Sequence, residues 1–154
     1  MISRQSNLIF GLFCLVLVGC STSAPKKSIY TQYEHAVDAY NEGRFSDAEP
    51  ILRKLLADHP QFAEGWFRLG NLYVRTGQNE AAITAFKTCL RYDANHTKAW
   101  HNLSLVHLKM GVAALDEGLV RTAPNTSDYN QLLALKKAML GVNADAAQLN
   151  KSTD

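Results

Sequence analysis

The chain has 154 residues, of which 47% are apolar, and a net charge of +2. This length allows one core of moderate size, and excludes an assembly of several large domains. The near-neutral charge gives no support for nucleic-acid binding, which usually requires a basic stripe, so we expect no nucleic-acid partner.

The N-terminal segment has the three-part layout of a secretory signal. Arg4 precedes an apolar run over 8–18, which is too short to cross a bilayer as a helix. The run ends in Leu17-Val18-Gly19-Cys20, which resembles the bacterial lipobox. The resemblance implies cleavage before Cys20, diacylglycerol on its sulfur and acylation of the new amine. The alternative is an ordinary signal peptide with a chance cysteine near its cleavage site.

The lipobox sets three expectations for this end of the chain. We expect a signal peptide over 1–19, then a lipidated Cys20 with a short solvated tether over 20–28. Acyl chains hold a folded domain at a membrane surface without spanning it. A serine directly after the cysteine, here Ser21, resembles the pattern in lipoproteins that are sorted to the outer membrane. The expected location is therefore the periplasmic face of a bacterial outer membrane.

A repeat of 34 residues runs through the middle of the chain. Glycine recurs at Gly43, Gly77 and Gly111, and other residues keep step with it. A fixed period of this length is typical of a stacked helix-turn-helix protein, in which neighbouring units bury each other's apolar faces. The period predicts three units, over 29–62, 63–96 and 97–128. The matching sets are Trp66 and Trp100, Leu69 and Leu103, Ala48 and Ala82, and Leu52, Phe86 and Val120.

The middle unit resembles the tetratricopeptide repeat (TPR) family most closely. The family pattern is W-x2-L-G-x2-Y, followed by A-x3-F. This unit has Trp66, Leu69, Gly70 and Tyr73, then Gly77, Ala82 and Phe86. The resemblance implies an all-α fold, an α-solenoid of three TPR helix-turn-helix units with a C-terminal capping helix.

The outer units depart from the pattern. The first has Gln32 in place of the opening tryptophan. The third has Ser104 for the small glycine, His107 for the tyrosine and Asp116 for the packing alanine. The second helix of the third unit is consequently the least well supported by the sequence.

The last part of the chain is expected to close the stack. An amphipathic stretch over 129–141 ends at Gly141, a plausible C-cap, and suits a capping helix with a polar outer face. A docking helix for a partner is the alternative. Residues 142–154 are small and polar without a period, which favours a disordered tail.

The first helix of each TPR unit faces a concave groove, and this places three sets of side chains there. The groove begins aromatic and ends cationic and amide-bearing, which suits a protein or peptide segment as partner. Asn71, Lys98 and Asn102 resemble part of a carboxylate clamp, although Phe67 stands where its first lysine would be. The alternatives are a solvated helix face and packing between units. The expected groove residues are Tyr33, Val37, Tyr40, Phe67, Asn71, Val74, Arg75, Lys98, His101, Asn102, Leu105 and Lys109.

No motif for catalysis stands out. The sequence has no phosphate-binding loop, no paired zinc cysteines and no His-Glu-x-x-His. His101 and His107 lie on different faces of their helix, and His107 is better explained by packing. Cys89 is expected to be a small buried residue. We therefore expect no enzyme activity, no metal and no cofactor apart from the lipid on Cys20.

Together these features predict a membrane-anchored periplasmic scaffold for protein-protein interaction. As a small TPR lipoprotein, the chain resembles the pilotins and assembly lipoproteins of type IV and Tad pili and of secretion systems. An adaptor for peptidoglycan enzymes or for outer-membrane protein assembly is a second possibility. A structural envelope lipoprotein and a small periplasmic enzyme are the remaining ones. The oligomeric state and the identity of the partner stay open.

Overall fold

The computed structural model describes residues 28–151, with side chains over 28–141. All the regular elements of this part of the chain are helices, and it contains no strand. The six helices are α1 (Ile29–Asn41), α2 (Phe45–Asp58), α3 (Ala63–Arg75), α4 (Asn79–Tyr92), α5 (Thr97–Arg121) and α6 (Ser127–Lys151).

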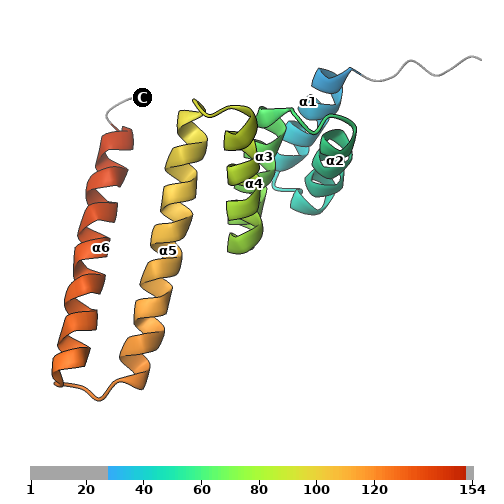
Figure 1. Ribbon diagram of the computed structural model, residues 1–154. Helices are drawn as coiled ribbons and strands as arrows, with labels where there is room; N and C mark the ends of the chain where they lie inside the picture. The colour runs from blue at the N-terminus through green and yellow to red at the C-terminus, as the bar shows by residue number, and fades with distance from the viewer. Residues whose placement is uncertain (1–27, 152–154) are drawn as a thin grey trace, which may run out of the picture.

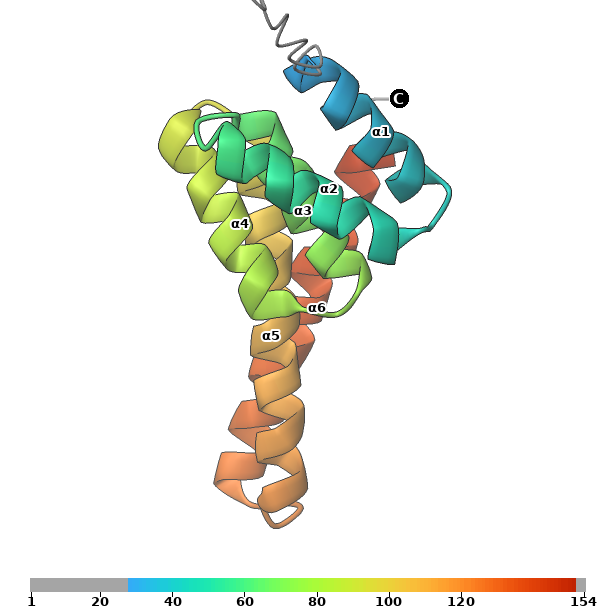
Figure 2. The same cartoon turned by 90° about the vertical axis from the view of Figure 1, so that its right-hand side faces the viewer.

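The helices form consecutive antiparallel hairpins that stack side by side (Figure 1). The first hairpin is α1 with α2, the second α3 with α4, and the third α5 with α6. Helix α3 also contacts both α1 and α5, so these three helices form one layer of the stack. Figure 2 shows that the longer α5–α6 hairpin projects beyond the first two hairpins.

Glycine makes the two tight turns between paired helices possible. Gly43 and Gly77 both have φ of +76°, a backbone conformation that side chains with a Cβ rarely adopt. The two positions are 34 residues apart, so the repeat in the sequence is a repeat of turn geometry. The first two units, 29–62 and 63–96, therefore have the expected helix-turn-helix form.

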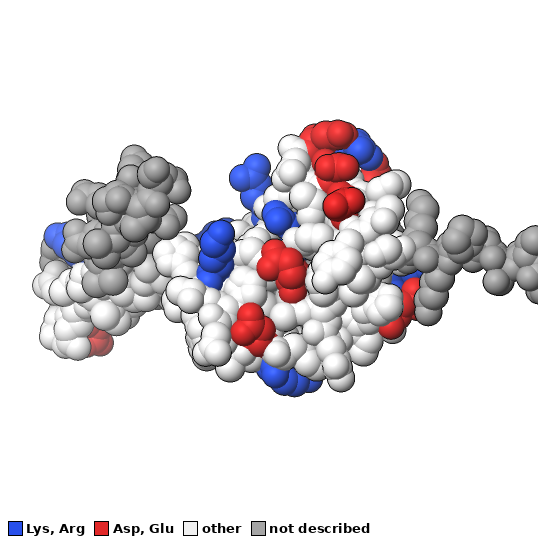
Figure 3. All heavy atoms as spheres, turned by 90° about the horizontal axis from the view of Figure 1, so that it is seen from above, with Lys and Arg blue, Asp and Glu red and all other residues white. Residues whose placement is uncertain are grey.

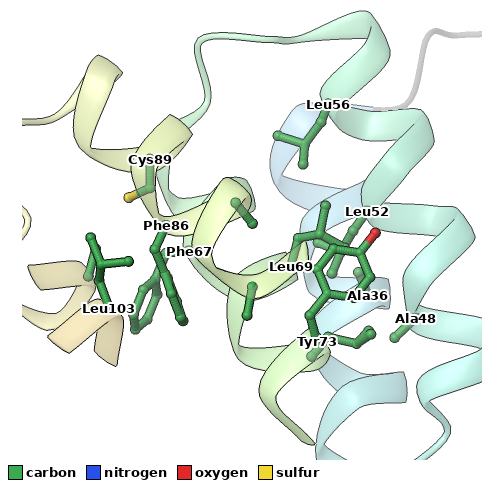
Figure 4. Packing of buried hydrophobic residues seen from close by; sticks show 14 of the residues in the cluster. Ala36, Ala48, Leu52, Leu56, Phe67, Leu69, Tyr73, Phe86, Cys89 and Leu103 are labelled. Atoms are coloured by element: carbon green, nitrogen blue, oxygen red, sulfur yellow. The ribbon is translucent and has the colours of Figure 1, made fainter. Parts of the chain in front are cut away.

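Small residues let the helices of a unit approach closely, and large ones fill the space between units (Figure 4). Ala48 and Ala82 are both completely buried. Gly70 lies against the ring of Phe86, which is also completely buried. One continuous core results, running from α1 and α2 through α4 into the first half of α5.

The third unit differs from the expected one, since no turn occurs at Gly111. Helix α5 continues through Gly111 to Arg121, and the chain reverses only before Ser127. The physical reason lies at Asp116, which takes the place of the buried Ala48 and Ala82 in the repeat. A turn at Gly111 would bury the carboxylate of Asp116, and burying an unpaired charge is costly. In the straight helix Asp116 stays exposed and pairs with Lys136 of α6.

The C-terminal helix is also longer than expected. The sequence placed a capping helix over 129–141 and a disordered tail over 142–154, but α6 runs from Ser127 to Lys151. Residues 142–151 include three alanines, the best helix former, so helix formation there needs no apolar period. Residues 152–154 lie outside the described part.

The predicted signal peptide over 1–19, Cys20 and the tether up to residue 27 also lie outside the described residues. In the described part, no helix is long and apolar enough to cross a membrane.

Candidate functional site: the concave groove

The inner layer of α1, α3 and α5 presents the face on which the expected groove residues lie. Asn71 of α3 and Asn102 of α5 meet on it, where Asn102 Nδ2 donates to Asn71 Oδ1 over 2.6 Å. Both side chains are half-buried. Each amide retains unused capacity, since Asn71 keeps its NH₂ donors and Asn102 its oxygen. The pair therefore offers a donor and an acceptor to a peptide backbone.

At one end of this face a polar network joins the three hairpins. Tyr33 of α1 donates to Glu64 of α3 over 2.9 Å, and the other oxygen of Glu64 lies 3.2 Å from His96 Nε2. His96 Nδ1 accepts from the backbone N–H of Ala99 and so caps α5. Nε2 must then carry the proton that is donated to Glu64. Burial raises the pKa of Tyr33, and neighbouring Arg68 opposes the rise.

Glu64 and His96 were not among the expected groove residues. The one signal in the sequence was the position of His96 directly before Thr97, where a helix begins. The distant pairing with Tyr33 and Glu64 depends on how the hairpins stack, and no local pattern encodes that.

Tyr40 and Arg75 take part in packing between the first two units. The guanidinium of Arg68 lies 5.3 Å from the centre of the Tyr40 ring, and that of Arg75 lies 5.9 Å from the Phe45 ring. Tyr40 also meets Phe45 edge to face at 5.4 Å. Such cation–π contacts fix the two guanidinium groups on this side of the stack. Val37, on α1 with Tyr40, and Val74, on α3 with Arg75, are half-buried.

Phe67 is not an exposed anchor in the groove, contrary to expectation. Its side chain is only 7% exposed, and its ring lies 4.6 Å from that of His96 and 6.1 Å from that of Phe86. Figure 4 shows Phe67 beside Phe86 within the core. Because α5 follows directly on α4, the stack covers this position, and Phe67 contributes to the core instead.

An apolar hollow lies between α5 and α6, further along α5 than Asn102. Its volume is ≈ 390 Å³, within the range of small binding pockets. Leu105 and Lys109 were expected on the groove face, and Leu140 was expected in the capping helix. Leu108 and Val112 were not expected to line a site, because the repeat predicted a turn at Gly111 in place of the continuous helix. We call this hollow the α5–α6 socket, and it is lined by Leu105, Leu108, Lys109, Val112 and Leu140.

The remaining expected residues, Lys98 and His101, are exposed on α5. Lys98, His101, Leu105 and Lys109 recur at intervals of three or four residues, so they share one helix face. Among the side chains that the structure describes, neither Lys98 nor Lys109 forms an ion pair.

A second hollow, of ≈ 440 Å³, lies between α2, α3 and α4 and includes Trp66, Tyr73 and Arg53. Trp66 donates to the carbonyl of Pro60 over 2.8 Å, and Trp100 repeats this bond to Ala94 over 3.0 Å. Of the two tryptophans only Trp66 lines this hollow, and the hollow is a seam between the first two units because α2, α3 and α4 line it.

Cys89 is buried and free, as the sequence predicted, and burial raises the pKa of its thiol to about 11. A thiol with so high a pKa is a poor nucleophile at neutral pH. Over the described residues, no group of three or more His, Cys, Asp or Glu side chains could hold a metal ion.

Comparison with known proteins agrees with this architecture. Residues 39–111 match the family model described as "Tetratricopeptide repeat". The chain is 25% identical over 83 residues to the protein O-mannosyl-transferase TMTC3 of Homo sapiens, covering 54% of this chain and 9% of that protein. It is 31% identical over 74 residues to protein bimA of Emericella nidulans, covering 48% and 9%. The chain thus spans about a tenth of the length of these curated relatives.

Two solved structures share the fold. A mutant of MamA aligns with a TM-score of 0.51 at 18% identity, covering 77% of this chain and 56% of that one. The type III secretion chaperone SycD of Yersinia enterocolitica, solved with a peptide of the translocator YopD, aligns with a TM-score of 0.55 at 20% identity. That alignment covers 82% of this chain and 96% of SycD. The described part of the chain is therefore an all-α solenoid with a TPR-like fold.

Proposed function

We propose that this protein is a lipid-anchored periplasmic scaffold, without enzyme activity, whose concave groove holds a segment of another protein. The observation that carries the proposal is the pairing of two amides close to an apolar hollow. Asn102 of the half-buried Asn71–Asn102 pair lies three residues, about one helical turn, from Leu105, which lines the α5–α6 socket. Amides that serve a peptide backbone, next to a hollow that accepts a side chain, are the two elements that peptide recognition needs.

The comparisons support a protein partner at the level of the fold. The SycD structure contains a peptide of YopD, and its alignment covers most of both chains. At 20% identity, this likeness supports the general mode of binding and does not extend to the partner. We propose the more specific role, an assembly factor or adaptor for an envelope machine such as a type IV or Tad pilus or a secretion system, from the lipobox and the small TPR scaffold together.

The membrane anchor is tested by metabolic labelling. Cells given labelled palmitate should incorporate it into the wild-type chain and not into Cys20→Ala, while Cys89→Ala should label normally as the matched control. Equal labelling of wild type and Cys20→Ala would exclude the lipoprotein assignment.

The groove is tested by affinity purification of the full chain from its native membrane. Asn71→Ala should lose a protein that wild type retains, because the amide that pairs with Asn102 and faces the groove is removed. Asn95→Ala, an exposed loop residue outside the groove, is the control. A partner retained equally by all three chains would show that binding takes place elsewhere.

A further inference from the structure

The α5–α6 socket exists because the third hairpin departs from the repeat. A turn at Gly111 would have removed Val112 from the continuous helix and placed α6 elsewhere. With α5 straight, Leu140 of α6 faces Leu105, Leu108 and Val112 across the hollow. Leu105 remains 36% exposed and Leu140 44% exposed, so their apolar surface is still available for burial.

Basic residues outnumber acidic ones in the third hairpin, since residues 97–141 contain five basic and three acidic side chains. Between Thr97 and Leu115 helix α5 contains Lys98 and Lys109 and no Asp or Glu. Between Tyr129 and Ala144 there are again two lysines and no acidic residue. One of them, Lys136, pairs with Asp116, but Lys98 and Lys109 have no ion pair among the described side chains.

The opposite end of the solenoid has the opposite character. Residues 28–62 contain six acidic and three basic residues. In the view from above, the largest group of acidic side chains lies at the α1–α2 end (Figure 3). A negatively charged segment would therefore be repelled at the first hairpin and attracted at the third.

We propose that the socket selects a partner segment in which a bulky apolar side chain lies between carboxylates. The apolar side chain enters the socket beside Leu105, and the carboxylates pair with Lys98 and Lys109. This inference rests on the proposed groove function and adds to it the chemistry of the segment.

Helix geometry sets the spacing of that segment. Leu105 lies four residues from Lys109 and seven from Lys98, which is about 6 Å and about 10 Å along the axis at 1.5 Å per residue. An extended peptide rises about 3.3 Å per residue. The matching pattern is therefore an apolar residue with an acidic residue two positions away on one side and three positions away on the other.

The test is selection from a phage-displayed library of random 12-residue peptides on the full chain, purified in detergent. Wild type should enrich peptides with this pattern. A Lys98→Glu and Lys109→Glu double variant should enrich lysine or arginine at the two flanking positions instead. Such an exchange of specificity is not produced by a general loss of structure. Lys87→Glu, an exposed lysine of α4, is the control and should select the wild-type pattern.

The apolar contact is tested by anisotropy with the most enriched peptide, labelled with fluorescein. Leu105→Gln and, separately, Leu140→Gln should weaken its binding at least tenfold. Val120→Gln makes a similar change on the same helix outside the socket, where Val120 is 87% exposed, and should leave binding unchanged.

Four results would overturn the inference. Enrichment of peptides without the two acidic residues would exclude the inference. Enrichment of the same peptides by wild type and by the Lys98→Glu and Lys109→Glu double variant would exclude it as well. If binding of those peptides were still lost in Asn71→Ala, the proposed groove function would stand without this further inference. Selection of no peptide would remove both proposals. A self-associating chain that Leu105→Gln turns into a monomer in analytical ultracentrifugation would show that a second copy fills the socket.

Discussion

The close packing of α3 against α4 in the middle unit depends on the absence of a side chain at Gly70. A Cβ built on Gly70 would lie 2.5 Å from Cε1 of Phe86. That ring is completely buried among its neighbours and has no room to move. The sequence pattern had identified Gly70 and Phe86 as repeat positions, and the structure shows that they are one contact.

We predict that Gly70→Ala destabilises the protein by about 1–3 kcal/mol, because it overpacks a full core. Gly141→Ala is the matched control in a helix, where a Cβ would meet nothing within 4 Å. It should stabilise by up to about 1 kcal/mol, since alanine is the better helix former. Urea unfolding followed by circular dichroism measures both. Equal effects of the two substitutions would contradict the assigned packing of α3 on α4.

Cys89 makes stability depend on pH in the alkaline range. Burial raises the pKa of its thiol from 9.0 to about 11, so the folded chain keeps a proton that the unfolded chain loses. The stabilising contribution is complete below pH 9 and is lost as the pH rises to 11. At about 1.4 kcal/mol per unit, the free energy of unfolding should fall by about 2–3 kcal/mol across this window.

The measurement is urea unfolding at several pH values for wild type and Cys89→Ala. Burial raises the pKa of Tyr73 and of Tyr33 as well, and both tyrosines remain in the variant. The difference in slope between the two chains therefore isolates the thiol. Identical slopes between pH 9 and pH 11 would mean that Cys89 is not buried as described.

At the scale of single elements, α5 shows where a sequence pattern can mislead. Gly111 keeps the 34-residue register of the turn glycines, but it lies within a helix. The 34-residue register shows which positions correspond in the repeat, whereas the conformation at each position depends on whether the following residues can pack. Here Asp116 cannot replace a buried alanine, and the helix continues until Arg121.

We predict opposite effects of alanine at two glycines of the same register. Gly77→Ala should destabilise by about 1–2 kcal/mol, because φ at this position is +76°. Gly111→Ala should be neutral or stabilise by up to about 1 kcal/mol, since it lies in a helix and meets only the flexible end of Met139. Thermal unfolding of both variants gives the comparison. If Gly111→Ala destabilised the protein as much as Gly77→Ala, Gly111 would lie in a turn, as the sequence register suggested, and not in a helix.

The first two hairpins could be predicted from the sequence because their signals are local. Two turn glycines and the buried alanines Ala48 and Ala82 fix the helices and their pairing. The inner face could be predicted in part, since Asn71 and Asn102 do lie together. The network of Glu64 with His96 and the α5–α6 socket could not, because they depend on contacts between residues about 30 positions apart or on the course of α6.

The molecule as a whole is a short solenoid with two different ends. At the α1 end, Gln32 and His35 occupy the positions that Trp66 and Leu69 use to pack on a preceding unit. This polar face gives the stack a natural first unit. The other end is the long α5–α6 hairpin, which projects beyond the stack (Figure 2). The layer formed by α1, α3 and α5 runs between these two ends.

The most direct test of the binding groove is photo-crosslinking from single positions in living cells. A photoreactive amino acid would replace Val37 or Leu105 on the groove face, and Thr88 or Val120 outside it. We expect the two groove positions to give the same protein adduct, identified by mass spectrometry, and the two outside positions to give none. An adduct formed only from Thr88 or Val120 would contradict the account, because it would place the partner on a face that the groove does not include.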